Sequence, residues 1–300
     1  MKKLYTPLLI LFSMPFNVLF AQVALPQFNP VQKQTTFSSE EEEGNPILCN
    51  DGASIFYNRT YIEKDGENII ATAQEVWFSA KRGKDWDKPY RLLREDDLAG
   101  ESLIVGANEK GTRIYVFNAL PDKDTLYKKL YYLDKTEEKY KWTEPTEVKI
   151  PGLTYGIDFV QIYVNSKETA ILISKPPQEN SNDLDIFISL KDGKGNWGQV
   201  IDLGKVINTK RVELGTFISN DLNTIYFSSD GHGGYGSADV FVSMRLDNSW
   251  QNWTKPVNLG EPVNSRDYEA SFTITRGNEI YFTSDRDGLT NNIYTGTVSG

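Results

Sequence analysis

An internal repeat of about 55 residues limits what this chain can fold into more than any other feature of its sequence. Within residues 211–260, three strand-like runs (GTFIS, TIYFSS and DVFVSMR) are followed by a WTKP step and a short fourth run, PVNL. Each run is rich in β-branched and aromatic residues and is bounded by Asn, Asp and Gly, which is typical of β-strands. The apolar centre of the second run recurs along the chain at Ile55, Ile114, Ile171, Ile225 and Ile280.

Two further positions keep the same period. Apolar residues of the third run recur at Val76, Leu130, Ile186, Val240 and Ile293, and a tryptophan recurs at Trp86, Trp142, Trp197 and Trp253. We expect this tryptophan to pack between neighbouring units, with carbohydrate stacking by Trp142 or Trp253 as the alternative. Short antiparallel strands in such units predict an all-β fold: a five-bladed β-propeller with four-stranded antiparallel blades.

The two ends of the chain complement each other. Pro30-Val31 resembles the fourth strand of a unit without the three strands that should precede it, and the last unit reaches Gly300 after its third strand. We therefore predict that the N-terminal segment, residues 22–42, supplies the outer strand of the last blade and closes the ring. The propeller itself is predicted over residues 43–300.

The first 21 residues have the pattern of a secretory signal peptide. MKK is positively charged, the run up to Phe20 is mainly apolar, and cleavage is expected after Ala21. Pro15 interrupts this short run, which disfavours a retained membrane anchor. The sequence therefore predicts an exported protein, in the periplasm or on the periplasmic side of the outer membrane, with no transmembrane span in the mature chain.

Charge and composition exclude several classes of function. The formal net charge is −9 and the pI is about 4.9, which disfavours nucleic acid and anionic membranes as partners. Cys49 is the single cysteine and His232 the single histidine, so an intramolecular disulfide is excluded and a zinc site is disfavoured. The sequence has no GxSxG nucleophile motif and no P-loop. We therefore predict no catalytic residue and no organic cofactor.

One acidic residue precedes the inner strand of each predicted blade. Converging carboxylates at a channel mouth could hold Ca²⁺, which takes six to eight oxygen ligands. The alternative, favoured by the repetition itself, is that each carboxylate satisfies backbone N–H groups of a neighbouring loop. The residues of this candidate cation ring are Glu43, Glu101, Asp158, Glu213 and Glu269.

Two groups of loop residues are candidates for binding a partner. The insertion at residues 59–74 is expected to be irregular, and it carries apolar side chains that mark interaction sites when exposed. The second group lies in the Gly- and Asp-rich loops of the fourth and fifth units, where the aspartates are also expected to form turns. The candidates are Tyr61, Ile62, Ile69 and Ile70, together with Asp230, His232, Tyr235, Asp285 and Arg286.

The segments YFSSDGHGGYGSADVFVS, WTKPVNLGEPVNSRDYEASFTI and YFTSDRDGLTNNIY resemble the TolB-type, WD-like propeller repeats of Gram-negative envelope proteins. In many of those proteins the repeats precede an OmpA-like domain, which this chain lacks. The resemblance implies a non-catalytic protein–protein scaffold in the periplasm, associated with an outer-membrane complex or type IX secretion. The alternative is a five-bladed glycan-binding or glycoside-hydrolase-like protein, because such propellers host sugar hydrolysis with carboxylates around the axis.

Overall fold

The computed structural model describes residues 25–65, 68–93, 102–118, 128–138, 141–153, 160–178, 181–288 and 290–299. Strands dominate this part of the chain, and its one helical element is the 3-10 turn η1, Asn50–Gly52. The strands, in chain order, are β1 Gln32–Lys33, β2 Glu42–Cys49, β3 Ser54–Asp65, β4 Asn68–Arg82, β5 Asp85–Trp86, β6 Tyr90–Arg91, β7 Ser102–Ala107, β8 Arg113–Asn118, β9 Lys129–Asp134, β10 Thr146–Glu147, β11 Gln161–Val164, β12 Ala170–Lys175, β13 Asp185–Leu190, β14 Ile201–Asp202, β15 Glu213–Ile218, β16 Thr224–Ser229, β17 Asp239–Met244, β18 Val257–Asn258, β19 Glu269–Ile274, β20 Glu279–Ser284 and β21 Asn292–Thr297.

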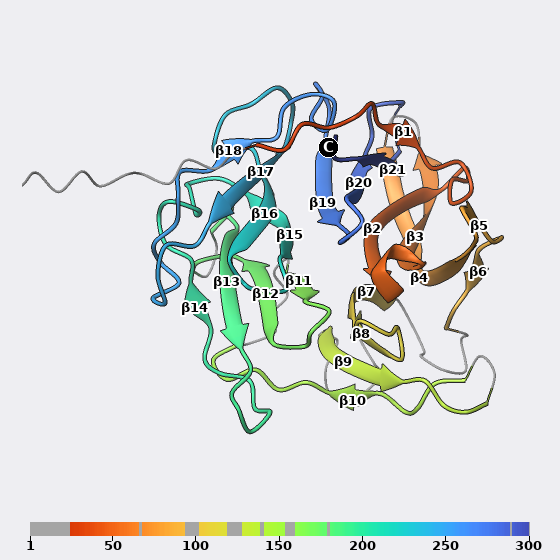
Figure 1. Ribbon diagram of the computed structural model, residues 1–300, viewed down its shortest axis with the longest axis horizontal. Coiled ribbons are helices and arrows are strands. Elements are labelled where there is room, and N and C mark those ends of the chain that lie inside the picture. Colours follow the sequence, from red (N-terminus) through yellow and green to blue (C-terminus); the bar gives the residue numbers. More distant parts are fainter. Residues whose placement is uncertain are drawn as a thin grey trace, which may run out of the picture.

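The strands form antiparallel sheets that radiate from a central axis (Figure 1). Two sheets have four strands, β1-β21-β20-β19 and β15-β16-β17-β18, and a third contains β2, β3, β4, β5 and β6. The fourth has the order β10-β9-β8-β7-β11-β12-β13-β14, and its two halves meet at one parallel bridge between Val164 and Gly106. A Cβ on Gly106 would lie 2.6 Å from the Val164 carbonyl oxygen, so only glycine allows this close approach.

The innermost strands surround the axis. Strand β2 contacts β7, β7 contacts β11, β11 contacts β15, β15 contacts β19, and β19 contacts β2 again. This closed circle, built from sheets with almost no helix, is the arrangement of a β-propeller. The prediction of an all-β, propeller-like fold is confirmed.

The N-terminal segment adds an outer strand to the last sheet. Gln32 and Lys33 of β1 pair antiparallel with Thr295 and Tyr294 of β21, and an isolated bridge joins Phe28 to Val298. The segment thereby covers the outer edge of β21, which would otherwise expose unpaired backbone groups. The predicted pairing of the N-terminal segment with the last sheet is confirmed.

The core lies between neighbouring sheets. Trp142, 8% exposed, packs in one cluster with Ile47 and Phe56 of the preceding sheet. Trp253, 3% exposed, packs with Ile186 and Ile188 in the same way. The recurring tryptophan therefore packs between sheets, as predicted, because its large apolar surface fills the wedge that two radiating sheets leave open.

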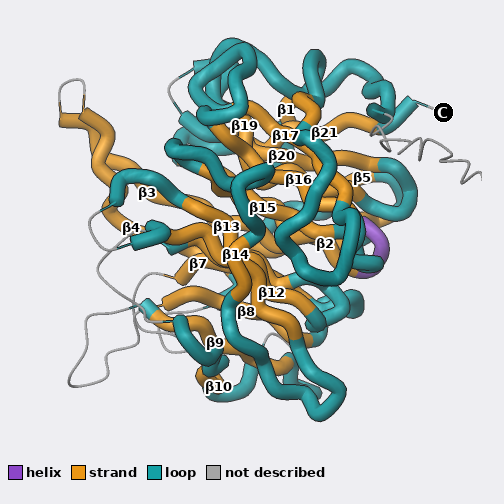
Figure 2. Tube along the Cα trace, turned by 90° about the vertical axis from the view of Figure 1, so that its left-hand side faces the viewer, coloured by secondary structure: helices purple, strands orange, loops and turns teal. Residues whose placement is uncertain are grey.

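Residues 59–74 do not form the predicted irregular loop. Residues 59–65 and 68–74 belong to strands β3 and β4, which pair continuously from Ser54↔Ala80 to Asp65↔Asn68, apart from one bulge between Tyr61 and Ile62. This two-stranded arm projects from the body of the molecule (Figure 2). The prediction is wrong because Asp65-Gly66 is a dipeptide typical of β-hairpin turns, which indicates two paired strands here and not an irregular loop.

Candidate functional site

Three carboxylates of the predicted cation ring are bound within their own turns. Glu43, Glu213 and Glu269 begin or lie near the start of inner strands, and each is 0% exposed. Each accepts hydrogen bonds from the backbone N–H and the hydroxyl of a Ser or Thr four residues earlier; for Glu213 these donors are Thr209 N at 2.8 Å and Thr209 Oγ1 at 2.7 Å. Burial raises the pKa of Glu43, and the bonds from Ser39 and Arg59 oppose that rise.

Because these donors occupy the carboxylate oxygens, the three residues do not fit a shared cation. In the described ranges, no group of three or more His, Cys, Asp or Glu side chains is placed to hold a metal ion. Glu101 and Asp158 lie outside the described residues. The hydrogen bonds of Glu43, Glu213 and Glu269 agree with the alternative expected from the sequence, in which each carboxylate satisfies backbone N–H groups of a loop.

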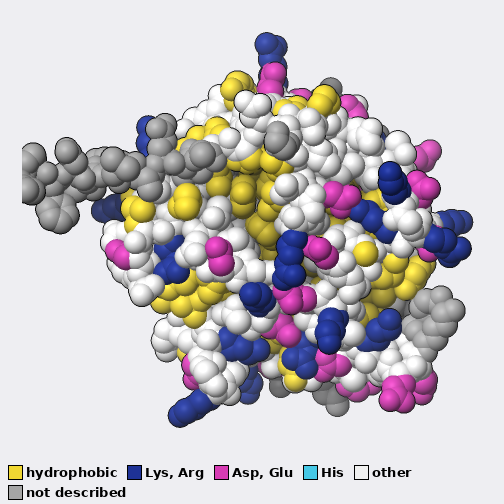
Figure 3. All heavy atoms as spheres, viewed as in Figure 1, with side chains coloured by type: hydrophobic (Ala, Val, Ile, Leu, Met, Phe, Trp, Pro, Cys, Tyr) yellow, Lys and Arg dark blue, Asp and Glu magenta, His cyan; other side chains and the backbone are white. Residues whose placement is uncertain are grey.

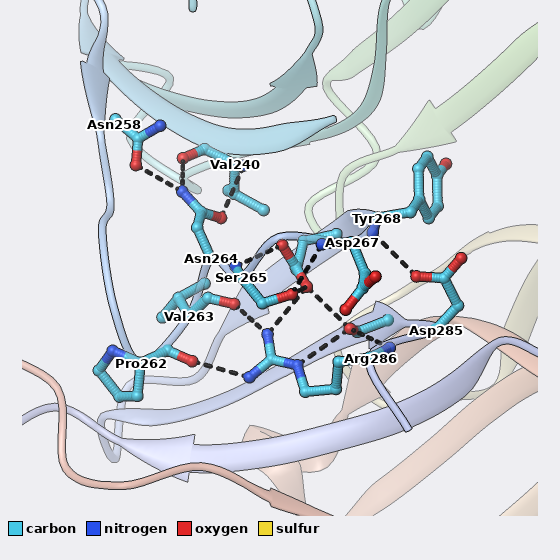
Figure 4. Close-up of polar contacts among 12 residues, drawn as sticks. Val240, Asn258, Pro262, Val263, Asn264, Ser265, Asp267, Tyr268, Asp285 and Arg286 are labelled. Atoms are coloured by element: carbon cyan, nitrogen blue, oxygen red, sulfur yellow. Dashed lines mark hydrogen bonds and ion pairs between the residues drawn. The ribbon is translucent and has the colours of Figure 1, made fainter. Parts of the chain in front are cut away.

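The junction before β19 shows how such a carboxylate is held (Figure 4). Arg286 donates from Nη2 to Glu269 Oε1 at 3.0 Å and from Nη1 to the Pro262 carbonyl oxygen at 2.9 Å, and it also donates to the Val263 carbonyl oxygen. Nearby, the Asn264 side chain bonds both backbone groups of Val240, accepting from its N–H and donating to its carbonyl oxygen at 2.9 Å each. These side chains replace strand-to-strand hydrogen bonds where the chain passes between sheets.

Most of the partner-binding candidates in the fourth and fifth units have such structural contacts. Asp230 accepts from Val212 N at 2.9 Å, and Asp285 accepts from Tyr268 N at 2.8 Å, so both close turns as expected. His232 bonds the Ile207 carbonyl oxygen through Nε2 at 2.8 Å, and its ring packs against two phenylalanines. Only Tyr235, which is 58% exposed, projects from this set into solvent.

On the arm, Tyr61 and Ile62 are partly buried. The Tyr61 hydroxyl donates to Glu75 Oε2 at 2.8 Å, and Ile62 N donates to Glu41 Oε2 at 2.9 Å. Ile69 and Ile70 lie in β4, opposite Lys64 and Glu63. The arm therefore has its own ladder and side-chain bonds, so these candidates lie in paired strands and not in an irregular loop.

At the other end of the axis, the turns that follow the inner strands surround a cavity of about 450 Å³, the axial cavity. Figure 3 views this face and shows hydrophobic side chains at the bottom of a hollow with charged side chains beside it. Every inner strand or its following turn contributes to the lining. The polar and aromatic contributors are Asn50, Asp51, Glu109, Tyr163, Ser166, Phe217, Ser219, Asn220, Thr273, Thr275 and Arg276.

A hydrogen-bond network links these turns across the axis. Glu109 Oε1 accepts from Arg276 Nη2 at 2.8 Å and from Asn220 Nδ2 at 3.4 Å, and Ser166 Oγ donates to Asn220 Oδ1 at 3.0 Å. A backbone hydrogen bond also links two of these turns: Asn50 N donates to the Glu109 carbonyl oxygen at 2.7 Å. Residues from four sheets, more than 50 residues apart in sequence, thus form one polar surface.

The cavity also has an aromatic wall and a strained turn. The rings of Tyr163 and Phe217 lie 5.6 Å apart, and burial raises the pKa of Tyr163, so its phenol stays neutral at ordinary pH. Asn50 and Asp51 have φ values of 50° and 54°, in the left-handed region that Asn and Asp tolerate better than other side chains. Such strain is concentrated at ligand-binding sites in many proteins.

Sequence reasoning missed this cavity because it searched the opposite face for acidic residues. The signal in the sequence was the polar residue or pair that follows each inner strand, such as Asn50-Asp51 and Ser219-Asn220. Those residues read as ordinary turns until the ring brings them together.

No protein-family model matches the chain, and no curated protein matches it. Solved structures with a similar fold include a glycoside hydrolase, with 12% identity over 92% of this chain and 90% of that chain and a TM-score of 0.57. A GH43_1 enzyme from Xanthomonas citri has 8% identity over 91% of this chain and 90% of that chain, with a TM-score of 0.54. A third similar structure is that of CoXyl43, a GH43 beta-xylosidase/alpha-arabinofuranosidase from a compost microbial metagenome, in complex with xylotriose and in a calcium-free form. It has 10% identity over 91% of this chain and 95% of that chain, with a TM-score of 0.50. At these identities the likeness shows the fold alone.

These similarities correct the resemblance drawn from the sequence. The prediction of a TolB-type, WD-like envelope repeat protein is wrong, since the similar solved structures described above are glycoside hydrolases. The predictions of a non-catalytic scaffold, of envelope or secretion partners, and of a chain that is not an enzyme are wrong for the same reason. The alternative, a glycan-binding or glycoside-hydrolase-like protein, has the better support. Among the described residues, no helix is long and apolar enough to cross a membrane.

Proposed function

We propose that this chain acts on glycans, as a glycoside-hydrolase-like propeller, and that its site is the axial cavity. The observation that carries the proposal is the convergence of polar groups from every inner strand beside Tyr163 and Phe217. The volume of about 450 Å³ lies within the range of about 300–1,000 Å³ common for small-molecule sites. Sugars suit such a lining, because their hydroxyl groups pair with amides, carboxylates and guanidinium groups while their C–H faces pack on aromatic rings.

We further propose that the ring has five blades. In support, the sheet order β10-β9-β8-β7-β11-β12-β13-β14 divides at the single parallel bridge into two groups of four strands. Five inner strands then surround the axis, and the sequence repeats with the same count. The axial cavity is the place where five such blades present their turns.

Two carboxylates in the axial cavity suit the chemistry of glycoside hydrolysis. That reaction uses two carboxyl groups about 5–9 Å apart, one to protonate the leaving oxygen and one to act as base or nucleophile. Glu109 is fixed by Arg276 and Asn220, and we assign it the second role. Asp51 is exposed on the turn after β2 and lines the same cavity, and we assign it the role of acid.

Hydrolysis of a panel of neutral and acidic oligosaccharides tests the proposal, with calorimetry to measure binding. Glu109→Gln and Asp51→Asn should each lower the hydrolysis rate about 10²–10⁴-fold while the substrate still binds. Glu144→Gln is the matched control, because this exposed carboxylate does not line the cavity. A wild-type chain that binds none of these glycans would refute the proposal, and binding without hydrolysis would reduce it to a glycan-binding role.

We also propose export, with residues 1–21 removed before the chain reaches the envelope. The pattern of charged, apolar and small residues up to Ala21 supports this. Mass spectrometry of the protein from fractionated cells should find a mature chain that begins at Gln22. A full-length cytoplasmic chain would contradict it.

A further inference from the structure

A second cavity, which we call the side pocket, opens beside the axial cavity and has a volume of about 270 Å³. The two cavities share Cys49 and Asn50 in their walls, so they adjoin at the end of β2. The side pocket lies between the sheet that begins at β2 and the group of strands β7 to β10. Its volume falls just below the usual range for a complete small-molecule site, so it suits an extension of the axial cavity.

The walls of the side pocket are aromatic. The ring centroids of Phe56 and Phe78 lie 4.9 Å apart, and those of Phe78 and Tyr90 lie 5.5 Å apart. Trp142 completes the wall from the neighbouring sheet, and Tyr90 is 36% exposed at the surface. Tyr90 and the partly buried Phe78 can receive the C–H face of a sugar ring, while Phe56 and Trp142 are buried and support this wall from the core.

Two lysines at the rim give the side pocket its charge. Lys110 and Lys135 are both exposed, and within the described part of the chain neither has an ion pair. Lys81, by contrast, bonds Glu279 at 2.6 Å and lies over Trp86. Lys191 and Lys135 occupy equivalent positions, because each forms a backbone bridge with the tryptophan of its unit, Trp197 or Trp142. The Lys191 ammonium lies 5.0 Å from the ring centroid of Trp197, but among the described residues Lys135 has no such contact with a ring.

The floor of the side pocket contains a neutral thiol. Burial raises the pKa of Cys49 to about 12, and the charge of Lys135 opposes this rise. The field of Lys135 therefore extends into the pocket, while the thiol adds no negative charge that would neutralise it. Cys49 is 3% exposed and acts here as part of an apolar floor.

Resting on the proposed function, we infer that the side pocket binds an acidic sugar, a uronate unit, of the glycan whose neighbouring unit occupies the axial cavity. The aromatic wall receives the ring, and Lys110 and Lys135 pair with its carboxylate. The shared wall at Cys49 and Asn50 places the two cavities side by side, as the binding of adjacent units of one chain requires. The substrate class is thus an acidic oligosaccharide.

Calorimetry with tetragalacturonate, tetramannuronate and their methyl esters tests this inference, because esterification removes the charge and keeps the backbone. At least one acidic form should bind at least about tenfold more tightly than its ester, and 0.5 M NaCl should reduce the difference. Lys110→Gln and Lys135→Gln should each weaken the acidic ligand about fivefold without affecting the ester. Lys194→Gln is the control, since this exposed lysine lines neither cavity.

The outcomes separate the two proposals. Equal affinity for acid and ester, or lysine variants that bind the acidic form as tightly as the wild type, overturns the acidic-sugar inference and leaves the axial cavity standing. If neither acidic oligosaccharide binds but neutral ones do, the inference is likewise overturned. If no glycan of any kind binds, the proposed function fails first, and the inference fails with it.

Discussion

Replacing Arg286 with methionine should destabilise the junction between the last two sheets. The Arg286 side chain is 16% exposed, and it donates to Glu269, which is 0% exposed, and to the carbonyl oxygens of Pro262 and Val263. Removing one partner of a buried ion pair costs about 3–5 kcal/mol, because a buried charge is left uncompensated. Methionine keeps the length of the apolar stem, so packing alone contributes little to the loss.

A second copy of the same motif decides where in that range the cost should fall. Glu213 is equally buried and is held by Thr209 and Ser229, with no arginine bond among the described residues. In the Arg286→Met variant, Glu269 would keep the equivalent donors on Ser265 and Ser284. We therefore expect the low end of the range, about 3 kcal/mol of unfolding free energy.

Urea unfolding of Arg286→Met, Glu269→Gln and the double variant measures the effect and the coupling. The two changes should not add: a coupling energy of about 1–3 kcal/mol is expected for residues in one network. The matched control is the double variant Glu213→Gln with Arg286→Met, in which the changes in unfolding free energy of the two single variants should add. A loss below about 1 kcal/mol for Arg286→Met, or a coupling of zero, would refute the claim that the ion pair holds this junction.

Further variants test other parts of the fold. Burial, and then the neighbouring carboxylates of Asp202 and Glu213, raise the pKa of Asp185 from 3.8 to about 6. The charged form of Asp185 therefore destabilises the folded state above pH 6. This destabilisation decreases as the pH falls from 6 toward 3.8, because the carboxylate becomes protonated in the folded state first. Asp185→Asn should therefore raise the free energy of unfolding by about 1 kcal/mol at pH 7.5, a value discounted for partial exposure, and should leave it unchanged at pH 3.5. Equal changes at both pH values in urea unfolding would contradict this. Gly106→Ala should cost several kcal/mol, about 3, because the new Cβ would collide with the adjoining strand; a melting temperature within 2 °C of the wild type would show that the strands can separate. Deleting residues 25–34 should expose the edge of β21 and cause aggregation, which light scattering would detect; a monodisperse product with unchanged melting temperature is the contrary result. Millimolar Ca²⁺ or EDTA should leave the melting temperature unchanged if the buried inner-strand carboxylates serve only their turns, and a rise with Ca²⁺ would reopen the cation ring.

The resemblance to envelope repeats failed for a physical reason. The residues that carried it are turn aspartates and glycines, the tryptophan between sheets, and strand residues such as those at 225–229. These residues satisfy requirements of the propeller itself, which recur in any protein built this way. Function depends on the site placed on the fold, so such motifs do not identify the chemistry.

The sequence alone determined the strand-rich architecture, the repeating unit and the pairing of the N-terminal segment with the last sheet. These follow from local patterns: alternating apolar residues, turn residues at fixed spacing and a fourth strand missing at one end and present at the other. The spacing of four between Ser39 and Glu43, repeated at Thr209 and Ser265, was also visible, but its meaning depended on the turn geometry that joins each pair.

Only the tertiary structure decided where the candidate site lies. Asp51, Glu109 and Arg276 are separated by more than 50 residues in sequence, and nothing local to any of them distinguishes it from a surface turn residue. They meet because closing the ring brings the ends of all inner strands to one axis. At the opposite end, the buried carboxylates of Glu43, Glu213 and Glu269 are bound by donors of their own turns, because a buried carboxylate is stable only where hydrogen-bond donors surround it.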